Sequence, residues 1–133
     1  MSASYNTEHG TLVNCIDGTV QLPAIDFAKK LWNVPWVDVI TEAAPERAFS
    51  DAASKAEVDH ILNNIKSSFV NQQKKRLAIV SHSSCDVNKV SDEKKIEMLH
   101  LAVNFLSQSF PDASVTGIWI DKKGALHPLN REC

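Results

Sequence analysis

The sequence lacks the features that mark several large classes of protein. Its 133 residues contain only three cysteines, at positions 15, 85 and 133, which are too few for a disulfide framework. A formal net charge of -2 provides no basic surface for nucleic acid or an anionic membrane. No apolar run approaches the roughly 20 residues of a membrane span, and the first residues are too polar for a secretory signal. We therefore expect a cytoplasmic protein that binds neither nucleic acid nor membrane.

What is present is typical of one globular domain. Hydrophobic residues make up 44% of the chain and charged residues 23%, both close to the averages for soluble proteins. A chain of this length buries a core without help from disulfides. We interpret residues 1–10, which are polar and end in glycine, as a leader, and residues 11–133 as a single domain.

Hydrophobic periodicity predicts strands that alternate with helices. This order is typical of an α/β protein with a mostly parallel sheet of four strands, helices on both faces and a short antiparallel edge hairpin at the C-terminus. The apolar run at 77–80 does not alternate with polar residues, which favours a central strand buried on both faces. Residues 41–51 show no regular pattern. The predicted strands are 11–15, 36–40, 77–80, 115–120 and the edge 125–127, which Pro128 ends, and the predicted helices are 23–33, 52–73 and 92–109.

Side chains able to bind a metal follow two of these strands. Cys15 and Asp17 come at the end of the first strand, and His82 and Cys85 come at the end of the third. If these strands are parallel neighbours, Cys15 and His82 emerge side by side and Cys85 returns from the following turn. Two sulfur ligands and one nitrogen suit zinc, and three protein ligands with one exchangeable position are typical of a catalytic site.

Each of these residues also has a simpler interpretation. A single His-x-x-Cys pair is weak evidence, because buried cysteines often behave as small hydrophobic residues. Asp17 could close the fourth metal position, or it could stay off the metal and orient a bound water. It could equally form an Asx-turn with the backbone ahead of Gly18.

Two stretches resemble the zinc motifs of the β-class carbonic anhydrases. Residues 15–19, Cys-Ile-Asp-Gly-Thr, match the family's Cys-x-Asp-x-Arg except at the last position, and residues 82–85 match His-x-x-Cys. The resemblance extends from about residue 11 to residue 129 and includes the closing hairpin. It implies that Cys15, His82 and Cys85 hold zinc, with Asp17 as a catalytic residue or fourth ligand. It also implies that a zinc-activated water converts carbon dioxide to bicarbonate.

The sequence departs from the family pattern near the first motif. Thr19, which is uncharged, replaces the arginine that normally pairs with the aspartate, so we expect Asp17 to be freer to coordinate zinc. Arg47 could substitute from the irregular stretch, although a solvated surface arginine is the commoner case. Asp86 stands where the family usually has glycine and adds negative charge beside two thiolates.

Three functions are compatible with these residues. The first is a zinc lyase or hydrolase that acts on carbon dioxide or a similar small substrate, and the second is a silent zinc-binding domain in which Asp17 closes the site. The third is a metal-free thiol protein with Cys15 and Cys85 as a redox pair, although a nearby carboxylate activates a thiolate poorly.

Cys133 has no evident role. The chain is short for the family, which usually has an N-terminal helical arm, but a homodimer through a sheet edge is possible, with Trp32, Trp36 or Trp119 contributing.

Overall fold

One five-stranded sheet forms the centre of the protein, described here by a computed structural model that covers residues 8–50, 55–70 and 72–130. Its strands are β1 (His9–Cys15), β2 (Trp36–Glu42), β3 (Arg76–His82), β4 (Ser114–Ile120) and β5 (Leu126–Asn130). They lie in the order β2-β1-β3-β4-β5, and all neighbours are parallel except the antiparallel β4–β5 pair. The predicted fold class is confirmed, and β3 is the central strand.

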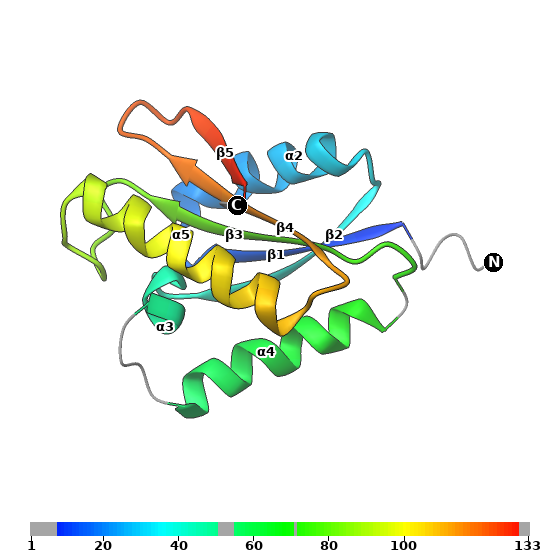
Figure 1. Cartoon of the computed structure of the whole chain (residues 1–133). Helices are drawn as coiled ribbons and strands as arrows, with labels where there is room; N and C mark the ends of the chain where they lie inside the picture. The colour runs from blue at the N-terminus through cyan, green and yellow to red at the C-terminus, as the bar shows by residue number, and fades with distance from the viewer. Residues whose placement is uncertain (1–7, 51–54, 71, 131–133) are drawn as a thin grey trace.

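The helices cover both faces of the sheet, as Figure 1 shows. Their bounds are η1 (Gly18–Val20, a 3-10 turn), α2 (Gln21–Trp32), α3 (Glu46–Ser50), α4 (Lys55–Phe69) and α5 (Asp92–Ser109). Alternate residues of the strands divide between two cores. Leu12, Ala78 and Val80 pack with α2, whereas Leu77 and Ile79 pack with α3, α4 and α5. No helix among the described residues is long and apolar enough to cross a membrane.

Several predicted boundaries were wrong, for local physical reasons. Strand β1 begins at His9, inside the proposed leader, because His9 pairs with Trp36 of β2 and its Nδ1 lies 2.9 Å from the Asp38 carboxylate. Strand β5 does not end at Pro128 but continues through it, which an edge strand tolerates because its outer side needs no hydrogen bonds. Helix α4 ends at Phe69 rather than near residue 73, and the side chain of Gln72 donates to Thr11 Oγ1 instead.

The stretch predicted to be irregular contains the short helix α3. Its first residue, Glu46, is 1% exposed and accepts a hydrogen bond of 2.8 Å from Asn88 Nδ2. A helix of five residues is too short to show hydrophobic periodicity, so its anchor across the fold could not be seen in the sequence. Residues 1–7 of the proposed leader, the first residues of the predicted second helix and Cys133 lie outside the described residues.

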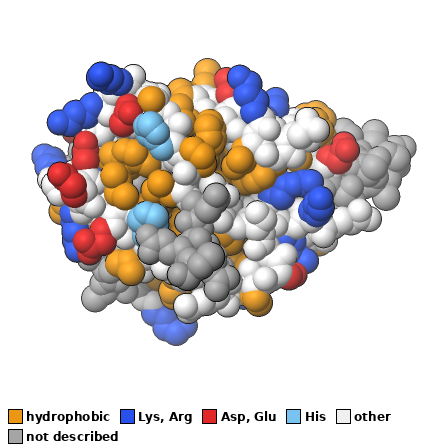
Figure 2. Space-filling model, turned by 45° about the horizontal axis from the view of Figure 1, so that its top comes forward, with side chains coloured by type: hydrophobic (Ala, Val, Ile, Leu, Met, Phe, Trp, Pro, Cys, Tyr) orange, Lys and Arg blue, Asp and Glu red, His pale blue; other side chains and the backbone are white. Residues whose placement is uncertain are grey.

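The three tryptophans occupy different environments. Trp119 is buried in the core, and the ring of Trp32 packs against Gly10 of β1. Trp36, on the outer strand β2, is 41% exposed. Figure 2 shows the face that carries β5 and α2, on which hydrophobic side chains gather with charged side chains around them. Leu22 and Leu31 of α2 are among the exposed hydrophobic residues.

Candidate metal centre

The carboxyl ends of β1 and β3 bring Cys15 and His82 to the same edge of the sheet. The two strands are parallel neighbours, in which Thr11 pairs with Leu77 and Val13 with Ile79. Cys15 is the last residue of β1, and His82 is the last residue of β3. The predicted adjacency of these strands is therefore confirmed, and it places the two side chains where open α/β sheets carry their sites.

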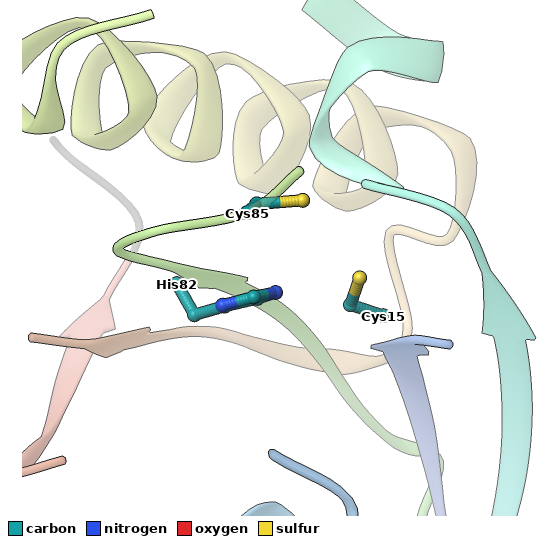
Figure 3. A group of neighbouring side chains, drawn as sticks. All are labelled: Cys15, His82 and Cys85. Atoms are coloured by element: carbon teal, nitrogen blue, oxygen red, sulfur yellow. The ribbon is translucent and has the colours of Figure 1, made fainter. Parts of the chain in front are cut away.

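A tight turn returns Cys85 to the same place. Ser84 adopts a left-handed backbone conformation with φ of 61°, which reverses the chain between His82 and Cys85. Ser83 ties the turn to two neighbouring elements. Its N–H donates to Ile120 O of β4 at 2.9 Å, and its hydroxyl donates to both carboxylate oxygens of Asp92, the first residue of α5, at 3.0 Å. Figure 3 shows Cys15, His82 and Cys85 pointing into one shared space.

These three side chains form a compact and buried group. Their potential ligand atoms, two Sγ and one imidazole nitrogen, all lie within 4.8 Å of one another. Cys15, His82 and Cys85 are 1%, 4% and 5% exposed, and both cysteines are free thiols. Ligand atoms that are about 2.1 to 2.3 Å from a tetrahedral zinc ion lie roughly 3.4 to 3.8 Å apart, so the three side chains could hold a metal after movements of about 1 Å.

The imidazole of His82 is oriented for a ligand. Its Nδ1 lies 2.9 Å from Ser83 O, which only accepts hydrogen bonds, so the proton is assigned to Nδ1. Its Nε2 then carries a free lone pair. Among the described residues, this buried atom has no hydrogen-bond partner. Such an orphaned acceptor is costly unless something binds it, and a metal ion fits that need.

The backbone after Cys15 is held by its own side chains. Asn14 Oδ1 accepts a hydrogen bond of 2.8 Å from the N–H of Cys15, and Asn14 Nδ2 donates to Val20 O at 3.3 Å. Gln21 Nε2 donates to the carbonyl oxygen of Cys15. These contacts fix the connection from β1 through η1 to α2, and with it the position of the Cys15 thiol.

Asp17 stands beside the group but outside it. Its Oδ1 accepts hydrogen bonds from the Thr19 N–H at 2.9 Å and the Thr19 hydroxyl at 2.8 Å. Its Oδ2 lies 4.0 Å from His82 Nε2, and the side chain is 34% exposed. The N–H of Thr19 and then its hydroxyl lower the pKa of Asp17 below its ordinary value and outweigh the opposing effect of burial, and the nearby His82 contributes least.

Thr19 therefore restrains Asp17 without a charge. The Asx-turn offered as the simpler interpretation of Asp17 is present, as the cap of η1. A hydroxyl and a backbone N–H of one residue thus hold Asp17 where the family pattern has an arginine, and the expectation that Asp17 is freer to coordinate zinc stays a prediction. A polar residue two positions after an aspartate is the signal that could have shown it.

The other sequence candidates lie apart from the group. Arg47 is exposed on α3, and within the described residues the hydrogen-bond donor to the Asp17 carboxylate is Thr19. Asp86 is exposed on the turn after Cys85. Lys95, which is 2% exposed near the start of α5, was not singled out from the sequence. Its place on the apolar stripe of that helix is the signal that could have found it.

Comparison with known protein families supports the resemblance seen in the two motifs. A family model described as "Putative carbonic anhydrase" matches residues 5–130, nearly the whole chain. The chain belongs to this family. A search of curated proteins gave no significant match to this carbonic anhydrase-like chain.

Proposed function

We propose that this carbonic anhydrase-like protein is a zinc enzyme that interconverts carbon dioxide and bicarbonate. Cys15, His82 and Cys85 would hold the zinc, and Asp17 would orient the reacting water. The observation that carries the proposal is the buried, unpartnered Nε2 of His82, which shares one small space with two free thiols. Membership of the carbonic anhydrase-like family gives the reaction class.

Zinc suits these donors better than other common metals. Two sulfurs and an imidazole are soft or borderline ligands, which disfavours magnesium and calcium. Two buried thiolates would carry a charge of about -2, which a divalent cation neutralises. The bound metal would thereby offset the desolvation penalty of burying the two charges. Zinc in such a site makes water nucleophilic near neutral pH, by lowering its pKa from about 15.7 towards 7.

The protein's own contribution is to place a base and to limit its movement. Asp17 Oδ2 faces the His82 side of the group, while Thr19 holds Oδ1. A carboxylate in this position accepts a hydrogen bond from the reacting water and leaves the water's lone pair directed at carbon dioxide. Because the side chain of Asp17 is one-third exposed, protons can pass from it to solvent.

The second candidate function is a silent zinc-binding domain. The 4.0 Å between Asp17 Oδ2 and His82 Nε2 favours it, because a small rotation would bring this oxygen into the fourth metal position. Thr19 opposes that rotation. Whether the site is open depends on the balance between one metal bond and the two hydrogen bonds from Thr19.

The test is hydration of carbon dioxide by the zinc-loaded protein, measured by stopped flow from pH 7 to 9, together with the zinc content per chain. We expect one zinc per chain and measurable hydration, both lost in Cys85→Ser. Cys133→Ser is the matched control and should retain both. Full zinc occupancy without hydration at any of these pH values would establish the silent domain instead. Absence of zinc together with a reversible disulfide would establish the redox pair.

We also propose that the protein acts in the cytoplasm as a homodimer. The two buried thiols must stay reduced to bind metal, which supports a reducing compartment. Strand β2 pairs with β1 on one side only, and its Trp36 is 41% exposed, which supports association through this edge. Sedimentation should show a dimer that Trp36→Glu weakens, and a monomer at all concentrations would contradict the proposal.

A further inference from the structure

A lysine occupies the buried face of helix α5. The other buried residues of this helix are mainly apolar and form the stripe that packs on the sheet. Lys95 belongs to the same stripe, and only 2% of its surface is exposed. Lysine is almost never this buried unless its charge has a partner.

The described part of the chain supplies no partner for its ammonium group. Other lysines are paired: Lys75 Nζ lies 3.2 Å from Asp112, and Lys94 Nζ lies 3.0 Å from Glu97. Among the described residues, Lys95 makes a backbone hydrogen bond to Ser91, but its side chain makes no ion pair or hydrogen bond. The ammonium group is therefore available to water or to a ligand from outside the chain.

A pocket adjoins this lysine. It has a volume of about 490 Å³ and lies between the turn that carries Ser83 and Ser84, the loop at 86–91 and the first turn of α5. Lys95 lines it, together with Lys89 and Lys122. We call this space the Lys95 pocket. It adjoins the candidate metal group at Cys85, but neither Cys15 nor His82 lines it.

The charges of the Lys95 pocket favour an anion. Three carboxylates also line it, but the one on Asp92 is engaged by the Ser83 hydroxyl, and Asp86 and Glu93 are exposed and well solvated. Lys95 is the most buried of these charged residues, and its positive charge opposes a cation. The start of an 18-residue helix adds a positive dipole end and backbone N–H groups.

We propose that the Lys95 pocket binds a small oxyanion and that Lys95 is its buried counterion. The lysines, the hydroxyls of Ser84 and Ser91 and the helix start are the donors that bind phosphate and bicarbonate alike. Bicarbonate would come from the proposed reaction, whereas inorganic phosphate or a phosphate monoester would come from solution. Binding itself does not depend on turnover, so the proposal stands or falls separately from the proposed function.

The test is titration of the zinc-loaded protein with inorganic phosphate and, separately, with bicarbonate, followed by backbone amide NMR. At least one anion should give saturable shifts at Ser83, Ser84 and Asp92. Lys95→Met should weaken that binding by about tenfold, because a charged hydrogen-bond donor is lost. Lys95→Arg should retain most of it.

The matched control is Lys94→Met, which removes the neighbouring exposed lysine that pairs with Glu97 and should leave the affinity unchanged. Saturation by bicarbonate alone or by phosphate alone identifies the source. Equal affinity in Lys95→Met and the unaltered protein, or no saturable shift with either anion, overturns the proposal. Lys95→Met should fold, because methionine fills the same volume without a buried charge.

Discussion

The carboxylate of Asp17 is controlled by a single uncharged residue. In the family pattern an arginine holds the corresponding carboxylate through charge, whereas here Thr19 gives two donors to the same oxygen, Oδ1. A neutral hydroxyl contributes about 1 kcal/mol to such a contact, less than a guanidinium would. The restraint on Asp17 is therefore real but weak, and it should respond to a small change at Thr19.

Thr19→Val removes the hydroxyl donor and keeps the N–H and the side-chain shape. We expect Asp17 to occupy the fourth metal position a few times more often, because about 1 kcal/mol corresponds to roughly a fivefold change in an equilibrium. The visible spectrum of the cobalt-substituted protein should change, and hydration should fall to a similar extent. Thr19→Ser is the control and should keep both close to the unaltered protein. An unchanged cobalt spectrum in Thr19→Val would argue that the N–H alone holds Asp17.

The sequence predicted the residues of the metal group but not what restrains them. Cys15, His82 and Cys85 could be found because each follows an apolar run, and the ends of parallel strands meet at one edge. The role of Thr19 was missed because, although the spacing of Asp17 and Thr19 suggests the contact, the contact itself depends on the rotation of one side chain into a turn. Lys95 was missed because a lysine on a helix is usually solvated, and its burial depends on how α5 packs.

Helix α2 packs on strand β1 through a contact that depends on glycine. A Cβ at Gly10 would overlap ring atoms Cε3 and Cζ3 of Trp32, the last residue of the helix. A rigid indole has little room to withdraw, so the close approach of helix and strand needs the bare backbone at this position.

Gly10→Ala should therefore destabilise the protein by about 1 to 3 kcal/mol, the usual cost of overpacking a tight contact. Chemical denaturation followed by circular dichroism measures the change. Gly18→Ala is the matched control, because nothing lies within 4 Å of a Cβ built there, and its unfolding midpoint should hardly move. If both variants unfold alike, Trp32 must shift without cost and the contact contributes little.

The β4–β5 turn is organised by the carboxylate of Asp121. It accepts hydrogen bonds from the N–H groups of Lys123 and Ala125, at 2.9 and 3.0 Å, and lies 2.8 Å from His127 Nε2. The bond to His127, then the N–H groups, lower the pKa of Asp121. A lowered pKa means that this carboxylate stabilises the folded state above its unfolded pKa of about 3.9, and that the contribution is lost as pH falls through the folded value.

Asp121→Ala should therefore expose β5 to faster hydrogen exchange at pH 6, and the difference from the unaltered protein should shrink below about pH 4. Amide exchange of Leu126, His127 and Leu129, followed by mass spectrometry or NMR, measures it. Exchange in β3 serves as the internal control and should not change. A difference that persists undiminished at low pH would mean that the carboxylate's charge is not responsible.

The periodic helices and the strands were predicted, whereas the five-residue helix α3 was not. The apolar run of β3 and the stripe of α5 have clear patterns, and both elements are present. Helix α3 has five residues, and its anchor is the buried pair of Glu46 and Asn88, which lie 42 positions apart. Contacts of that kind leave no local pattern, so only the folded chain shows them.

At the scale of the whole molecule, the candidate metal centre joins two segments that are distant in sequence. Cys15 ends β1, and His82 and Cys85 follow β3, near the middle of the sheet. The two strands pair directly, and the helices of both faces pack on them. A metal bound there would therefore link the two halves of the chain at the sheet's centre, and its binding free energy would add to the stability of the whole fold.

Removal of zinc should consequently lower the melting temperature of the entire domain. At free zinc about 1,000 times the dissociation constant, binding stabilises the folded state by about 4 kcal/mol, which corresponds to roughly 10 °C or more for a domain of this size. Differential scanning calorimetry with and without a chelator measures it. Cys85→Ser should melt alike in both conditions, whereas Cys133→Ser should keep the full zinc-dependent rise. The rise should also diminish as pH falls, because both thiols must lose their protons to bind the metal. A zinc-dependent rise that survives in Cys85→Ser would place the metal elsewhere in the chain.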